Sequence, residues 1–172
     1  MVLHSIFYTF YLQEDWFREI KNQFFYFFMK IIFDYNRTLF DPETEQLYSG
    51  VLQLLKDLAK KHELFLISRN EKGRKRSMHA RGIEKFFQKK AFVRKKTKRI
   101  FQKLVGRFSK DVIVIGDRVR EEIRIGNMLG YRTIWLRRGK FSSELPLNEK
   151  EVPKHIICKI IECRKIIKLY EK

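Results

Sequence analysis

The sequence predicts a three-layer, Rossmann-like α/β domain, in which a central parallel sheet carries helices on both faces. From residue 29 onward, short apolar runs typical of buried strands alternate with amphipathic segments typical of helices. Several of these runs end in a polar residue, at the edge where such sheets usually bind their ligands. With 172 residues, the chain is long enough for one domain and too short for two ordinary ones.

Six apolar runs have the length and composition of buried strands. They cover residues 29–33, 63–68, 91–93, 111–117, 131–136 and 155–158. Apolar residues at helical spacing predict helices at 51–61, 97–108, 120–129 and 160–170, with a shorter helix-like stretch at 83–87. Gly130 directly follows the third of these helices and is a typical terminating residue. The basic segment between 68 and 83 and the loop at 140–153 carry no comparable pattern.

Residues 1–28 form an aromatic extension that differs from the domain expected at 29–172. Five charged residues interrupt it, whereas a membrane span needs about 20 nearly uncharged residues, so we expect no membrane span. The extension also lacks the basic start and small-residue cleavage site of a signal peptide. It is either an amphipathic arm, which docks on the domain, on a partner or on a membrane surface, or a stretch that results from a translation start assigned too early in the sequence. We favour the second interpretation, with Met29 as the initiator.

The formal net charge of +18 is concentrated in one segment. Residues 71–110 contain sixteen Lys or Arg and two acids, a net charge of +14. Such a segment attracts anions, which include phosphorylated substrates, nucleic acids and acidic membrane surfaces. The equally acceptable alternative is a lysine-rich solvated surface without a specific partner.

The two cysteines give little structural information. Cys158 and Cys163 lie five residues apart, without a neighbouring His or Cys cluster. This is neither a disulfide framework nor a zinc pattern, and reduced thiols in a cytoplasmic protein fit it best.

Three predicted strands end in side chains that are suited to chemistry. Asp34, Ser68 and Asp117 follow the runs that begin at residues 29, 63 and 111. Each residue alone has an ordinary alternative, since Ser68 and Asp117 could cap helices and Asp34 could begin a turn. Because the carboxyl ends of parallel strands share one edge, we expect the three side chains to lie close together.

Four motifs in sequence order carry a resemblance to a known family. They read IIFDYNRTLFD around Asp34, LFLISRN (64–70), RKKTKRIF (94–101), and VIGDRVREEIRIGNMLGYRTIWLRRG (114–139). In this order they resemble the haloacid dehalogenase (HAD) superfamily of phosphohydrolases, and the resemblance extends from about Met29 to Ile167. It implies a HAD-like fold and a phosphorylated substrate.

The resemblance also implies a magnesium-dependent reaction through an aspartyl-phosphate. Asp34 would be the nucleophile. Asp34, Asp117 and the backbone carbonyl of Asn36 would hold Mg²⁺ with hard oxygen ligands. Glu122 would be the further acid of the metal site, and Glu121 is the neighbouring candidate.

Other residues would bind the phosphoryl group. Ser68 would donate a hydrogen bond to it, and Asn70 and Arg37 would lie beside it. A lysine of the third motif would neutralise the charge that develops during transfer. Counting back from Phe101 slightly favours Lys95 over Lys96, with Lys98 as a further alternative.

Two positions depart from the pattern of the family. Asn36 replaces the aspartate that protonates the leaving group and then activates water, and an amide does neither. The loss of general acid–base assistance typically costs about 10²–10⁴-fold in rate. Arg37 replaces the following glycine and brings a guanidinium beside the phosphate pocket.

The spacing of the motifs leaves no room for a cap domain. About 33 residues separate Asp34 from Ser68, and about 26 separate Ser68 from Lys95. An open, basic site favours a large or polyanionic phosphorylated substrate, nucleic acid included. We expect a phosphohydrolase that Asn36 makes slow. The alternatives are a catalytically degenerate domain that binds a phosphorylated partner or nucleic acid, and a phosphotransferase.

Overall fold

The computed structural model describes residues 29–106, 109 and 111–171. The aromatic extension at 1–28 lies outside the described residues, so its two interpretations and the start at Met29 stay predictions. Within the described part, six strands form one parallel sheet in the order β5-β4-β1-β6-β7-β8. The strands are β1 (Lys30–Asp34), β4 (Glu63–Arg69), β5 (Lys89–Val93), β6 (Val112–Gly116), β7 (Arg132–Leu136) and β8 (His155–Ile157).

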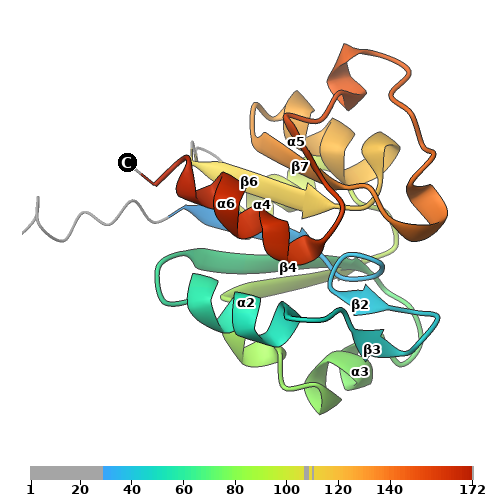
Figure 1. Cartoon of the computed structure of the whole chain (residues 1–172), viewed down its shortest axis with the longest axis vertical. Helices are drawn as coiled ribbons and strands as arrows, with labels where there is room; N and C mark the ends of the chain where they lie inside the picture. The colour runs from blue at the N-terminus through green and yellow to red at the C-terminus, as the bar shows by residue number, and fades with distance from the viewer. Residues whose placement is uncertain (1–28, 107–108, 110, 172) are drawn as a thin grey trace, which may run out of the picture.

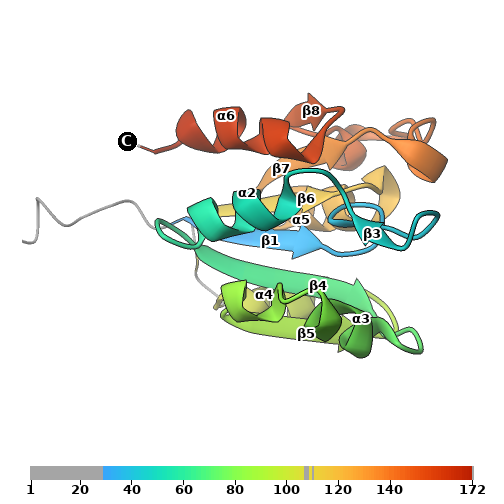
Figure 2. The ribbon, with the colours of Figure 1, turned by 60° about the horizontal axis from the view of Figure 1, so that its bottom comes forward.

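Helices cover both faces of this sheet (Figure 1), so the predicted three-layer α/β class is confirmed. Ile31 and Phe33 of β1 pack with helices α2 (Val51–Leu58), α3 (Arg74–Ala80) and α6 (Cys163–Lys168). Ile32, which points the other way because strand side chains alternate, packs with α4 (Lys98–Val105) and α5 (Arg124–Met128). Figure 2 shows the same layers from a second direction.

The strand order reverses on the two sides of β1. From β1 the chain proceeds to β4 and β5 on one side, then crosses to β6, β7 and β8 on the other. Ligands of such sheets bind beyond the carboxyl ends of the strands at this reversal. The expected site therefore lies where β1 and β6 end.

Two elements near that edge were not expected from the sequence. The first is α3, in which only Arg74 and Met78 are buried, so it has no apolar stripe. The second is the hairpin of β2 (Phe40–Asp41) and β3 (Gln46–Leu47), whose Phe40 stacks on Tyr35 with ring centres 5.2 Å apart. The two elements are joined by Arg81, which donates to the backbone carbonyl of Glu45 and lies 4.7 Å from the centre of the Phe40 ring.

The remaining elements differ from the predictions mainly at their ends. The helix expected at 120–129 begins as a π-helical turn, η2 (Val119–Ile123), and the closing helix begins as a 3₁₀ turn, η5 (Ile160–Glu162). Three further 3₁₀ turns are η1 (Glu84–Phe86), η3 (Gly139–Phe141) and η4 (Glu149–Glu151).

No cap domain interrupts the described residues between the strand ends. Only the hairpin and α2 separate β1 from β4, and only α3 and η1 separate β4 from β5. The helices of the described part are also too short and too polar to cross a bilayer.

Candidate active site

The carboxyl edge of the sheet brings together the two aspartates expected there. Asp34 is the last residue of β1, and Asp117 directly follows β6. Phe33 lies opposite Ile115 in the sheet, so the two aspartates leave neighbouring strands at the same edge. Each is only 3% exposed, and both line one cavity of about 80 Å³.

Lys96 links two carboxylates in this cavity. Its Nζ lies 2.5 Å from Oδ1 of Asp34 and also donates a hydrogen bond to Glu122. Burial by itself would lower the pKa of Lys96, but Asp34 and Glu122 outweigh it and hold that pKa above its usual range. Lys96 therefore stays protonated and fixes the orientation of the Asp34 carboxylate.

The slight preference for Lys95 is wrong, because Lys96 is the lysine that enters the cavity. Lys96 is buried, whereas Lys95 and Lys98 are exposed. Thr97 caps α4 with its side chain, and the turn between β5 and this cap leaves Lys96 on the inner side. The register of that turn cannot be counted from the sequence.

Thr38 contacts the second oxygen of Asp34. Its hydroxyl lies 3.3 Å from Oδ2 of Asp34, and the threonine is fully buried. Sequence analysis did not single out Thr38, although it belongs to the first motif, DYNRTL. Both oxygens of Asp34 therefore have a donor.

The cavity holds more acidic groups than cations. Burial, together with the charges of Asp34 and Glu122, raises the pKa of Asp117 to about 9. Burial likewise raises the pKa of Glu122 to about 7, although the charge of Lys96 opposes this. One lysine thus faces three buried carboxylates.

The oxygens of the cavity fit a hard divalent cation. Oδ2 of Asp117 is buried and has no hydrogen-bond partner, and the repulsion between Asp34 and Asp117 is the kind that a cation removes. Mg²⁺ is often held by one or two carboxylates and completes its shell with water and phosphate oxygens. No three His, Cys, Asp or Glu side chains of the described part form a ready-made metal cluster. Asp34 and Asp117 are therefore the side chains that fit best; Lys96 donates to both Asp34 and Glu122, and the place of Glu122 in the metal site stays a prediction.

Asn36 is held by an arginine that sequence analysis did not single out. Arg74 donates from Nη1 to Oδ1 of Asn36 at 2.9 Å, and from Nη2 to Glu71. Its guanidinium lies 5.1 Å from the centre of the Tyr35 ring, and the residue is only 7% exposed. No sequence signal separates Arg74 from the other cations of residues 71–110.

Arginines form the rim of the cavity. Arg37 has a φ of 62°, the left-handed conformation that explains why the family has glycine at this position. The guanidinium groups of Arg37 and Arg118 lie 5.4 and 4.4 Å from the centre of the Phe141 ring. Arg69 also lines the cavity and pairs with Glu121 at 2.9 Å; Glu121 lines the cavity as well and stays the neighbouring candidate. Arg118 pairs with Glu144 at 3.1 Å, so Arg37 is the rim arginine that has no acid partner among the described residues and can meet an anion.

The structure does not bring Ser68 and Asn70 to the cavity wall. Ser68 is buried, but its hydroxyl donates to the backbone carbonyl of Arg69 at 3.2 Å. Asn70 is exposed after the end of β4 and does not line the cavity, so its place beside the phosphate stays a prediction. Arg69 lines the cavity instead.

Comparisons with known proteins agree with this geometry. A family model described as HAD-hydrolase-like matches residues 91–163. No curated protein sequence matches the chain.

Solved structures share the fold at low sequence identity. YfnB of Bacillus subtilis, a HAD hydrolase bound to magnesium, is 21% identical with a TM-score of 0.60, over 72% of this chain and 57% of YfnB. A HAD-like hydrolase from Streptococcus pneumoniae is 14% identical with a TM-score of 0.67, over 81% of this chain and 98% of its own. The D,D-heptose 1,7-bisphosphate phosphatase of B. bronchiseptica, complexed with magnesium and phosphate, is 12% identical with a TM-score of 0.65, over 83% and 99% of the two chains.

The chain thus spans little more than half of YfnB but nearly the whole of the two smaller proteins. The family model covers the second half of the domain, and the shared fold extends over the first half as well. Residues 91–163 thus match a HAD-hydrolase-like family model, and the domain as a whole has the fold of these HAD-like proteins.

Proposed function

We propose that the protein is a magnesium-dependent phosphohydrolase that acts through an aspartyl-phosphate on Asp34. The observation that carries the proposal is the shared cavity of Asp34 and Asp117, with Lys96 against the first aspartate and arginines on the rim. A carboxylate attacks a phosphate dianion only when the negative charge of the phosphate is offset. Asp34, Asp117 and the backbone carbonyl of Asn36 would hold Mg²⁺, which would supply that positive charge.

The protein's own residues prepare Asp34 for attack. Lys96 and Thr38 orient its two oxygens. An oxygen of Asp34 bonds to phosphorus while the bond from phosphorus to the leaving oxygen breaks. The leaving oxygen then takes up a proton. Water then attacks phosphorus, releases inorganic phosphate and restores the carboxylate.

Asn36 limits the proton transfers in both steps. Its Oδ1 already accepts a hydrogen bond from Arg74, and an amide neither gives nor takes a proton near neutral pH. The aspartyl-phosphate therefore depends on solvent for its hydrolysis and persists longer. This favours a phosphotransferase as the second candidate, because a slowly hydrolysed intermediate has time to meet another acceptor.

Comparison of Asp34→Asn with Asp111→Asn tests the proposal. Asp111 lies just before β6, at the opposite end of the strand that leads to Asp117, so it is a matched control. With Mg²⁺ and a small phosphomonoester, we expect Asp34→Asn to lose about 10³-fold or more of the rate and Asp111→Asn to keep it. Equal rates for wild type and Asp34→Asn would leave only a domain that binds a phosphorylated partner.

The two candidate activities differ in the fate of the intermediate. Intact mass measured after acid quenching should show a phosphorylated wild-type protein and an unmodified Asp34→Asn variant. If an added alcohol or nucleoside acquires the phosphoryl group faster than water does, the protein is a phosphotransferase. If water always wins, it is a phosphohydrolase.

A further inference from the structure

A second, larger groove opens beside the active-site cavity, between the β2–β3 hairpin and α3. It has a volume of about 650 Å³. Asn36, Arg37 and Glu71 line both the groove and the cavity, so the two spaces adjoin. A molecule with one end against Asp34 can therefore extend past these three residues along the groove.

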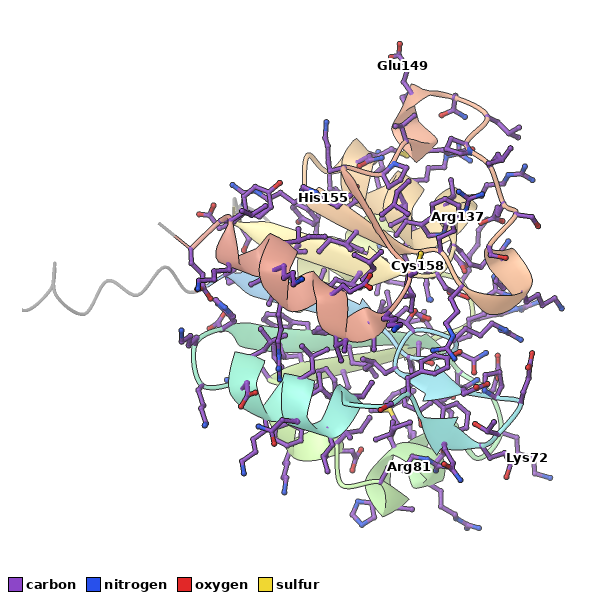
Figure 3. The ribbon with its side chains drawn as sticks, viewed as in Figure 1. Lys72, Arg81, Arg137, Glu149, His155 and Cys158 are labelled. Carbon is purple, nitrogen blue, oxygen red and sulfur yellow. The ribbon has the colours of Figure 1, made fainter. Side chains whose placement is uncertain are left out.

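The groove is strongly cationic. Five basic side chains line it against two acids, Glu45 and Glu71; the bases are Arg37, Lys72, Arg74, Arg76 and Arg81. Glu71 is already paired with Arg74 at the base of the groove. Figure 3 shows Lys72 and Arg81 beside the hairpin and α3. Lys72 and Arg76 are exposed and engage no acid of the described residues, so their charges face whatever enters.

The aromatic rings beside the groove are covered by cations. Arg81 lies 4.7 Å from the centre of the Phe40 ring, and Arg74 lies 5.1 Å from that of Tyr35. Proteins that bind single strands through their bases need open aromatic faces for stacking. The groove therefore recognises negative charge along a backbone rather than the faces of bases.

The basic surface continues past the groove. Lys75 of α3 lies 5.3 Å from the centre of the Phe92 ring of β5, which joins the two elements. The exposed Arg94 and Lys95 then follow β5, directly before Lys96 of the cavity. A small bisphosphate would need only the groove, whereas a charged surface of this extent fits a chain with a phosphate in each unit.

We propose that the groove holds a single-stranded nucleic acid whose terminal phosphate lies against Asp34. The proposal rests on the proposed phosphohydrolase function, since it names the substrate class of the same site. Contact through phosphates makes binding independent of base sequence and strongly dependent on salt.

The test measures binding separately from turnover. Asp34→Asn protein, and wild type in the presence of a metal chelator as a second background, are titrated into a fluorescent single-stranded DNA of about ten nucleotides. One DNA carries a 5′-terminal phosphate, one a 3′-terminal phosphate, and one neither. Anisotropy gives the affinity at several salt concentrations.

Two double variants with equal charge change locate the binding surface. Lys72→Glu/Arg76→Glu alters the groove, and Lys165→Glu/Lys168→Glu alters exposed residues of α6, which both views show well away from α3 (Figures 1 and 2). We expect the groove pair to weaken binding by about tenfold or more. The slope of log K against log salt should become less steep by about 1.4. The α6 pair should change affinity by less than about threefold.

Two results would overturn the proposal. Equal weakening by the groove pair and the α6 pair would mean that only net charge matters. Groove-dependent binding of fructose 1,6-bisphosphate, together with no groove-dependent binding of DNA, would assign the groove to small bisphosphates. Neither result affects the Asp34-dependent hydrolysis of a small phosphomonoester, so failure of this inference and failure of the proposed function are distinguishable.

Discussion

An aspartate at position 36 tests how the site controls protons. Asn36→Asp restores the residue that the family uses as general acid and base. In this chain, however, Nη1 of Arg74 lies 2.9 Å from Oδ1 of residue 36, and Arg74 is only 7% exposed. A carboxylate there forms an ion pair with a buried guanidinium, which lowers its pKa by about 1–3 units. We therefore expect Asn36→Asp to supply a base but almost no acid.

The magnitude follows from the fraction of protonated carboxyl. With an ordinary pKa near 3.9, about one aspartate in 10³ is protonated at pH 7. A further lowering by 1–3 units reduces this fraction by another factor of about 10–10³. Arg74→Met removes the charge and leaves an apolar chain against Tyr35. The double variant should then exceed Asn36→Asp by about 10–10³-fold in acid-dependent steps, a coupling of about 1.4–4 kcal/mol.

The assay compares two leaving groups. An alkyl phosphate needs a proton on its leaving oxygen, whereas p-nitrophenolate leaves without one. Because kcat/KM covers the steps up to departure of the leaving group, the alkyl-to-aryl ratio of kcat/KM isolates the acid. We expect this ratio to rise little in Asn36→Asp, not at all in Arg74→Met, and strongly in the double variant.

A single result refutes the reasoning about Arg74. If Asn36→Asp alone raises the alkyl-to-aryl ratio as far as the double variant does, the guanidinium does not govern protonation at position 36. Urea unfolding of all four proteins serves as the control, because Arg74 is buried and its loss lowers stability.

Three further predictions concern the charges of the domain. Lys96→Met leaves two buried carboxylates without their cation and should cost about 3–5 kcal/mol in urea unfolding, whereas exposed Lys95→Met should stay within about 0.5 kcal/mol of wild type. Burial and neighbouring acids raise the pKa of Asp117 to about 9, so the metal-free fold binds a proton that the unfolded chain has released. The stability of the metal-free protein should thus fall as pH rises from about 4 to 9. The affinity for Mg²⁺ should rise by up to about tenfold per pH unit between pH 7 and 9, and calorimetry in two buffers should detect the released proton. Burial lowers the pKa of His62 despite its hydrogen bond to Glu171, so as pH falls the imidazole takes up a proton in the unfolded chain before it does so in the fold. The stability should therefore fall as pH drops below about 6.5, and His62→Gln should reduce that loss, as measured by thermal unfolding.

The sheet and its two aspartates were predictable because local patterns encode them. An apolar run that ends in Asp34 specifies a buried strand, and the same is true of the run before Asp117. Once the class of sheet is known, both residues must emerge at one edge. Nothing beyond strand order is needed to bring them together.

The cationic half of the site was not predictable in the same way. Lys95 and Lys96 are identical in type, and only the turn between β5 and the cap at Thr97 decides which one is buried. Arg74 lies on a helix without an apolar stripe, and its role comes from contacts with Asn36 and Tyr35, far away in the sequence. Residues whose positions depend on tertiary contacts leave no periodic signal.

The charges of the site form two zones. The inner zone has three buried carboxyl groups and one lysine, Lys96. Burial and the crowding of these acidic groups raise the pKa of Asp117 and Glu122. A divalent cation would relieve this crowding, whereas a phosphate dianion alone would add to it. The outer zone, made of Arg37, Arg69 and Arg118, attracts anions. The rim therefore gathers phosphate at the entrance, and a cation held by Asp34 and Asp117 would favour the approach of phosphorus to Asp34.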